Sequence, residues 1–158
     1  MRKLSVVVTL LALYPTTIIA QHKINLAKEK EKLLEVHHTD RKAHFQTDTS
    51  LILRHAADEF IAVSNGKVSK SSREEVKQFF EGYFKNAKYS EWDDLEPPII
   101  KISNDASMAW MIVRIKVSRT QGTQGGTQKD ISFVYAGIMT YEKKNGKWVR
   151  VANVSTFE

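Results

Sequence analysis

Two histidines and an arginine recur at helical spacing in the first third of the chain. His37, Arg41 and His44 are four and three residues apart, so on a helix they share one face with the apolar Leu33. Polar groups on an inward face must find partners there or face a cavity. Histidine can transfer protons near neutral pH, and arginine can bind an anionic group. The stripe therefore predicts the wall of a pocket.

This stripe allows three interpretations. The functional one makes His37, Arg41 and His44 ligand contacts, with His44 or His37 as a candidate general base. In the structural alternative, Arg41 extends into solvent and the histidines bond to buried backbone. A metal site fails on distance, because His37 and His44 lie roughly 10 Å apart along a helix, whereas zinc ligands lie about 2 Å from the ion. We expect neither a metal nor a cofactor.

Further candidates for ligand contacts lie in the second half of the chain: Trp92, Tyr135, Asn153 and Ser155. Tyr135 could donate a phenolic hydrogen bond, which also makes it a candidate catalytic group. By strand alternation, Asn153 and Ser155 share a face with Val149 and Val151. The structural alternative for Tyr135 is a core or interface aromatic with a satisfied hydroxyl.

Composition and missing motifs exclude several function classes. The chain has 158 residues, a formal net charge of +6 and no cysteine, so disulfide frameworks and thiol catalysis are excluded. Basic residues occur mostly in mixed-sign runs such as 28–32, without the basic stripe and stacking aromatics of a nucleic-acid-binding protein. We therefore expect no nucleic-acid partner. No nucleophile elbow or glycine-rich phosphate loop is present in the sequence.

The N-terminus has the pattern of a secretory signal. Arg2 and Lys3 precede the apolar run Leu4–Leu13, and Ala20 ends a short tail. The apolar run is shorter than the roughly 20 residues that a membrane-spanning helix needs. We therefore expect a signal peptide over residues 1–20, cleavage near Ala20, and an exported domain over 21–158 that is periplasmic or secreted.

The remaining pattern predicts helices followed by strands. Asn65-Gly66 and Asn145-Gly146 are hairpin turns, and Ser72 with Glu75 forms a capping box. The expected helices are 24–46, a short turn over 51–57 capped by Asp48 or Thr49, and one from Ser72 to near Asn86; the expected strands are 59–64, 67–69, 89–103 with a break at Pro97-Pro98, 106–120, 130–143 and 147–157. This order indicates an α+β fold with helices on one face of a curved antiparallel sheet.

Several segments resemble the SnoaL-like branch of the nuclear transport factor 2-like superfamily. They are RKAHFQTD, DEFIAVSNGKV, SSREEVKQFF, MAWMIVRIKV and YEKKNGKWVRVANVSTF, within residues 37–157. The resemblance implies a cone-shaped curved antiparallel sheet with N-terminal helices on its concave face, a deep pocket between them, and dimers formed through the sheet. Many members carry a histidine two residues before a serine near the end of the last strand. Here that position, before Ser155, is Asn153, which counts against the commonest acid–base arrangement.

Three functions remain open at this point. The first is a small-molecule-binding domain with a partly apolar pocket and no assembled acid–base pair. The second is an isomerase- or dehydratase-type enzyme with a pocket histidine as base and a tyrosine as hydrogen-bond donor. The third is a homodimeric assembly module in which the outer sheet face is functional. Fold alone cannot decide among them.

Overall fold

The computed structural model describes residues 25–123 and 126–158. The expected signal peptide and its cleavage site lie outside these residues. The elements are α1 (Leu26–Gln46), α2 (Thr49–Leu53), β1 (Ala56–Ser64), β2 (Lys67–Ser72), α3 (Arg73–Phe84), β3 (Ala87–Asp94), β4 (Ile99–Ile102), β5 (Met108–Gly122), β6 (Gln128–Lys144) and β7 (Lys147–Phe157). No helix in the described part is long and apolar enough to cross a membrane.

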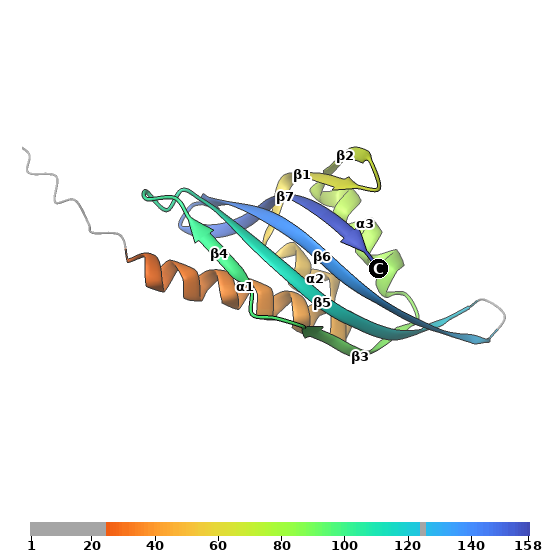
Figure 1. Cartoon of the computed structure of the whole chain (residues 1–158). Helices are drawn as coiled ribbons and strands as arrows, with labels where there is room; N and C mark the ends of the chain where they lie inside the picture. The colour runs from red at the N-terminus through yellow and green to blue at the C-terminus, as the bar shows by residue number, and fades with distance from the viewer. Residues whose placement is uncertain (1–24, 124–125) are drawn as a thin grey trace, which may run out of the picture.

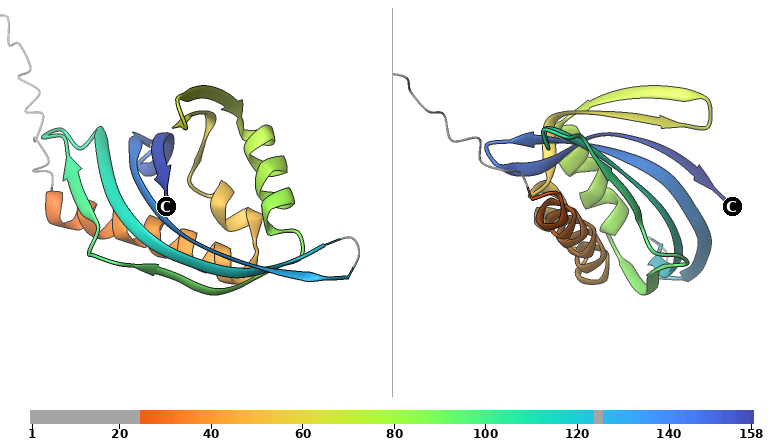
Figure 2. Two further views of the ribbon diagram at one scale, coloured as in Figure 1. Left: turned by 45° about the vertical axis from the view of Figure 1, so that its right-hand side comes forward. Right: turned by 60° about the vertical axis from the view of Figure 1, so that its left-hand side comes forward.

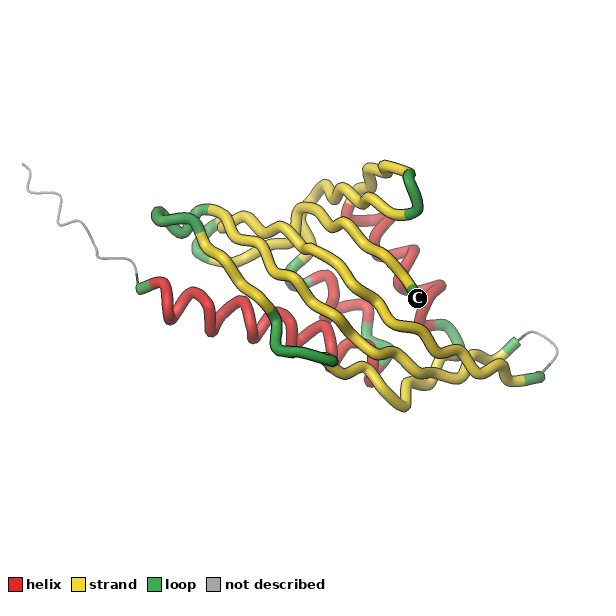
Figure 3. The backbone as a smooth tube through the Cα atoms, in the orientation of Figure 1, coloured by secondary structure: helices red, strands yellow, loops and turns green. Residues whose placement is uncertain are grey.

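The strands form one seven-stranded sheet in the order β2-β1-β7-β6-β5-β3, with β4 also paired to β5. The sheet curves strongly, and the three helices lie on its concave side (Figures 2 and 3). The α+β cone is confirmed. One strand pair differs from the expected antiparallel pattern, because β1 and β7 run parallel. These strands are distant in sequence, so the chain between them is long enough to make the crossover that a parallel pair requires.

Local signals place the helix ends close to where they were expected. The Asp48 side chain caps α2, and Ser72 and Glu75 form the predicted capping box of α3. Thr47 takes a left-handed conformation with φ of 49° and ends α1. This sharp end turns the chain so that α2 packs beside α1 and β1 can enter the sheet.

The core lies between α1 and the concave face of the sheet. Leu33, Val36 and Ala43 of α1 are buried, as are all five alternate residues of β5 that were predicted to face inward. Those β5 residues are Ala109, Met111, Val113, Ile115 and Val117. This packing fixes the orientation of α1, so the polar residues on its C-terminal half have fixed positions relative to the sheet.

A buried acidic residue anchors the other end of α1. Glu29 accepts hydrogen bonds from Trp148 Nε1 at 2.9 Å and forms ion pairs with Lys143 at 2.7 Å and Lys32 at 2.9 Å. Burial by itself would raise the pKa of Glu29, but these donors lower it to about 2. The first turn of α1 is thereby fixed to β6 and β7.

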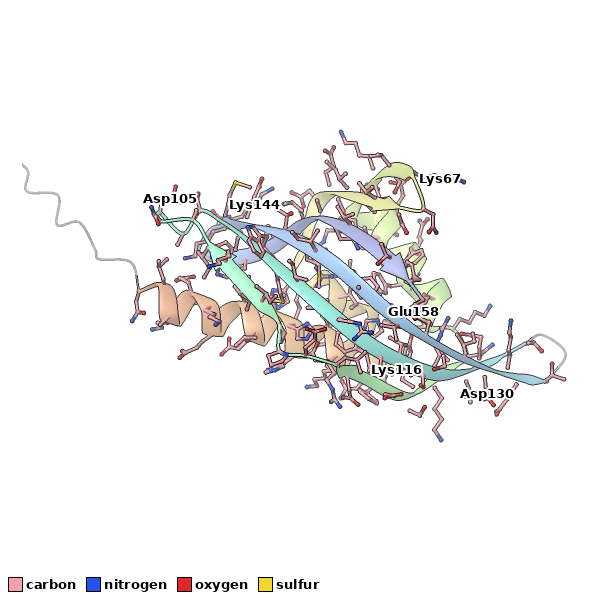
Figure 4. The ribbon with its side chains drawn as sticks, in the orientation of Figure 1. Lys67, Asp105, Lys116, Asp130, Lys144 and Glu158 are labelled. Atoms are coloured by element: carbon pink, nitrogen blue, oxygen red, sulfur yellow. The ribbon has the colours of Figure 1, made fainter. Side chains whose placement is uncertain are left out.

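The convex face of the sheet carries a continuous row of β-branched residues. Paired positions run across the strands in the order Ile99, Ile112, Ile138, Val154, Val63 and Val68. Four of them, Ile99, Ile112, Val154 and Val68, are exposed. This face points toward the viewer in Figure 1, and Figure 4 shows Asp105, Asp130 and Lys67 at turns or strand ends around it. The row is an apolar surface without cover from any described residue.

Candidate functional site

A cavity of about 440 Å³ lies between the helices and the concave face of the sheet. Its wall is mainly apolar and aromatic: Ile52, Phe60, Val76, Phe79, Phe80, Tyr83, Trp92, Ile115, Val117, Phe133, Met139 and Phe157. The polar members are Asp40, His44, His55, Ser64, Ser69, Ser71, Glu75, Tyr135, Arg150, Asn153 and Ser155. Volume and composition match those of sites for small organic ligands, which span about 300–1,000 Å³.

The polar wall centres on an ion pair between a helix and a strand. Arg150 Nη2 of β7 donates to Asp40 Oδ2 of α1, and Asp40 is only 4% exposed. Burial disfavours the charged guanidinium, but the adjacent Asp40 carboxylate raises the pKa of Arg150 above its ordinary value. Asp40 Oδ1 and Arg150 Nε have no hydrogen-bond partner among the described residues. Both atoms are fully buried, so the pair is held inside the wall.

A β-bulge places Arg150 on the cavity side of β7. Arg150 pairs with Tyr141 and Ala152 with Thr140, so Val151 is an extra residue without a partner on β6. The bulge shifts the alternation by one residue. Arg150 therefore shares the concave face with Asn153 and Ser155. The expectation that Val149 shares that face is wrong, because Val149 is the direct neighbour of Arg150 and pairs with Glu142.

His44 lies inside a cage of aromatic rings. The ring centroids of Phe80, Tyr83, Phe84, Tyr89 and Trp92 lie between 4.9 and 6.4 Å from that of His44. Burial lowers the pKa of His44 to about 4, so the imidazole is neutral at pH 7. Its Nδ1 lies 2.7 Å from the Asp40 carbonyl oxygen, which can only accept, so Nδ1 carries the proton. Nε2 therefore holds a free lone pair.

Tyr135, Asn153 and Ser155 form the sheet side of the polar wall. Asn153 Nδ2 donates to the Tyr135 hydroxyl at 3.4 Å, and burial raises the pKa of Tyr135, which keeps its proton at neutral pH. Gly137 makes room for this hydroxyl, since a Cβ there would lie 2.5 Å from it and 2.8 Å from the Val154 carbonyl oxygen. The Tyr135 proton has no acceptor among the described residues and can be donated to a ligand.

Two of the expected pocket residues lie elsewhere. His37 is buried, but its Nε2 lies 2.8 Å from Asp94 Oδ2 at the end of β3, and its Nδ1 has no partner within the described chain. Arg41 binds Asp93 Oδ1 at 2.6 Å and covers the Phe45 ring. Neither belongs to the cavity wall. The prediction that His37, Arg41 and His44 line one pocket is therefore wrong for His37 and Arg41.

The positions of His37 and Arg41 on α1 explain why they lie away from the cavity. His37 lies two turns before His44, where the helix meets the end of β3 rather than the open part of the cone. Arg41 projects from the adjacent face, one residue after Asp40. The other predicted contacts, His44, Trp92, Tyr135, Asn153 and Ser155, lie together on the cavity wall.

The sequence analysis missed Asp40 and Arg150. Asp40 is spaced four residues before His44 and three after His37, so the helical stripe already contained it. Arg150 carried no such signal, because simple alternation puts it on the face opposite Asn153. No group of three or more His, Asp or Glu side chains in the described ranges could hold a metal ion.

Comparison with solved structures identifies the fold. The chain superimposes with a TM-score of 0.66 on a candidate calcium/calmodulin-dependent kinase II association domain from Exiguobacterium sibiricum, at 9% identity over 85% of this chain and 97% of the other. A candidate dehydratase of the nuclear transport factor 2-like family from Streptomyces avermitilis also gives 0.66, at 10% identity over 83% and 96%. A nuclear transport factor 2-like protein with a cystatin-like fold from Novosphingobium aromaticivorans gives 0.59, at 13% identity over 82% of both chains.

No family model matches the sequence, and no curated protein matches it. The chain therefore has the nuclear transport factor 2-like, cystatin-like fold, and at these identities the likeness extends to the fold alone. Proteins with this fold include one described as an association domain and one described as a dehydratase. What this chain does must be argued from its own cavity.

Proposed function

We propose that this protein is a small-molecule-binding domain whose ligand enters the cavity between the helices and the sheet. The observation that carries the proposal is the cavity itself, about 440 Å³ with a mainly aromatic wall and a polar region at Asp40 and Arg150. An apolar wall contributes affinity, and a few placed polar groups set the orientation of the ligand. The ligand is accordingly a partly apolar molecule with one polar end.

The state of the polar groups favours binding over proton transfer. The buried Asp40 carboxylate is already bonded to Arg150. His44, with a pKa of about 4, is a weak base at neutral pH. An isomerase- or dehydratase-type enzyme with His44 as base and Tyr135 as hydrogen-bond donor is the second candidate, because both side chains lie on the cavity wall.

A homodimer formed through the convex face of the sheet is part of this proposal. The apolar row from Ile99 to Val68 crosses the strands and is exposed at Ile112 and Val154. A second copy supplies the same row, so a two-fold axis on this face would cover apolar side chains with apolar side chains. The cavity is lined by the helices and the concave face, so a dimer through the convex face does not cover it.

The proposal also includes export of the protein and its membership of one branch of the superfamily. The basic start and apolar run within residues 1–20 support cleavage near Ala20 and a periplasmic or secreted domain over 21–158. The quoted segments support membership of the SnoaL-like branch. Under this proposal the ligand is bound outside the cytoplasm.

Native mass spectrometry of the protein purified from its own organism tests the binding function. We expect a retained small molecule on the wild-type protein and its loss in Ala62→Trp, which fills the cavity from β1. The control is Ile61→Trp, because Ile61 is 41% exposed on the opposite face of the same strand. A wild-type protein that carries no small molecule after purification, and that converts none of the small molecules added to it, would contradict both the binding function and the catalytic alternative.

A further inference from the structure

The cavity wall offers an unused hydrogen-bond acceptor as well as an unused donor. His44 Nε2 makes no hydrogen bond in the described chain, and the hydroxyl proton of Tyr135 has no acceptor there. Asp40 Oδ1, Asn153 Oδ1 and Arg150 Nε also lack partners within the described residues, but these atoms are fully buried. A ligand that satisfies the accessible groups of this wall must donate as well as accept. A carboxylate only accepts, so it leaves His44 Nε2 without a partner.

The charges on the wall are already balanced at the polar end. Asp40 neutralises Arg150, and His44 is uncharged at pH 7. The remaining charged wall residue in the described chain, Glu75, is exposed and accepts from Ser72 at the start of α3. An ionised ligand would bring an uncompensated charge beside this pair in a mainly apolar enclosure, and burying such a charge is unfavourable.

We propose that the cavity selects uncharged ligands whose polar end carries an N–H or O–H donor beside an acceptor, such as an amide, over carboxylates and ammonium ions of the same size. The donor of the ligand pairs with His44 Nε2, and its acceptor pairs with the Tyr135 hydroxyl. This inference rests on the proposed binding function and names the chemical class of its ligand.

Three probes with one apolar body test the inference on the wild-type protein. Phenylacetamide, phenylacetate and phenethylamine differ in the charge of the polar end at pH 7, and affinities are measured by NMR titration. We expect the amide to bind at least about tenfold more tightly than either charged probe. Equal or tighter binding of phenylacetate or phenethylamine would overturn the inference.

A substitution at the compensating carboxylate should reverse the selectivity. In Asp40→Asn the Arg150 charge is left without its carboxylate, so phenylacetate should become the tightest probe. The control is Asp93→Asn, the same change in a carboxylate that pairs with Arg41 outside the cavity, and it should keep the amide preference. If Asp40→Asn folds and still prefers the amide, charge compensation by Asp40 is wrong.

The results separate failure of the inference from failure of the binding function. If all three probes bind and Ala62→Trp abolishes binding, the cavity binds small molecules, and the ranking alone decides the inference. If no probe shows binding that is sensitive to Ala62→Trp, both the inference and the cavity-binding function fail. The wild-type ranking decides the inference even if Asp40→Asn does not fold.

Discussion

Asp40 of α1 and Arg150 of β7, which are 110 residues apart in the sequence, form an ion pair on the cavity wall. The pair joins the helical layer to the sheet at the point where the packed core opens into the cavity. It also places two buried charged side chains in a mainly apolar wall. Stability and ligand chemistry therefore depend on the same two side chains.

Removing one partner of this ion pair should lower the free energy of unfolding more than removing both partners. Arg150→Met leaves the Asp40 carboxylate buried without a counter-charge, and we expect a loss of about 3–5 kcal/mol in the free energy of unfolding, measured by urea denaturation. The double variant Asp40→Leu/Arg150→Met replaces the pair with apolar groups and should recover most of that loss. Equal stability of the wild-type protein and Arg150→Met would contradict this role.

His44 should make the folded state sensitive to mild acid. Its pKa is about 4 in the folded protein and near the ordinary 6.5 when unfolded, so between these values the unfolded state binds more protons. Stability should therefore fall as the pH drops from about 6.5 toward 4, by up to about 3 kcal/mol. Urea denaturation at a series of pH values measures this.

The matched variant for that series is His44→Phe, which keeps an aromatic ring inside the cage. The difference in unfolding free energy between wild type and variant should change steadily over this pH range. A difference that stays constant from pH 6.5 to pH 4 would show that His44 titrates normally in the folded state.

Glu29 should stabilise the folded protein most at pH values above its ordinary pKa. Glu29→Gln removes the ion pairs with Lys143 and Lys32 and should lower the free energy of unfolding at pH 7 by about 1–3 kcal/mol. The folded pKa of about 2 lies below the ordinary 4.5, so this contribution is present above pH 4.5 and is lost as the pH falls toward 2. Chemical denaturation of the wild type and Glu29→Gln at pH 7 and pH 2 measures the difference in their free energies of unfolding. This difference should be smaller at pH 2, and an equal difference at both pH values would contradict the role of Glu29.

A charge placed in the apolar row should break the proposed dimer. Ile112→Glu puts a carboxylate within the apolar row of the convex face, and sedimentation velocity should show the wild-type dimer replaced by monomer. The control is Leu26→Glu, because Leu26 on α1 has a similar exposure, 40% against 38% for Ile112. Monomeric wild-type protein at micromolar concentration, or a dimeric Ile112→Glu, would contradict assembly through this face.

Much of the fold was predictable because its signals are local. The alternation in β5 and the Ser72–Glu75 capping box depend only on residues close in sequence. These two predictions are confirmed, and their signals are encoded within a few residues. The helical stripe was less reliable, because of its three polar residues only His44 lies on the cavity wall.

The site was harder to predict, since two of its features depend on tertiary structure. The extra residue Val151 reverses the face of Arg150, and alternation cannot reveal a bulge that forms against β6. The partners of His37 and Arg41 come from the end of β3, at Asp94 and Asp93. Whether a polar residue on a helix lines a cavity or binds a neighbouring strand depends on which element lies opposite it.

A crystal structure of the protein purified from its own organism, without added ligand, tests the central claim most directly. The account predicts density for a small organic molecule in the cavity, with an apolar body against Phe80 and Phe133 and an uncharged polar end near Asp40 and Arg150. A cavity filled by rearranged side chains or holding only water, in a protein that also shows no affinity for the amide probe, would contradict it.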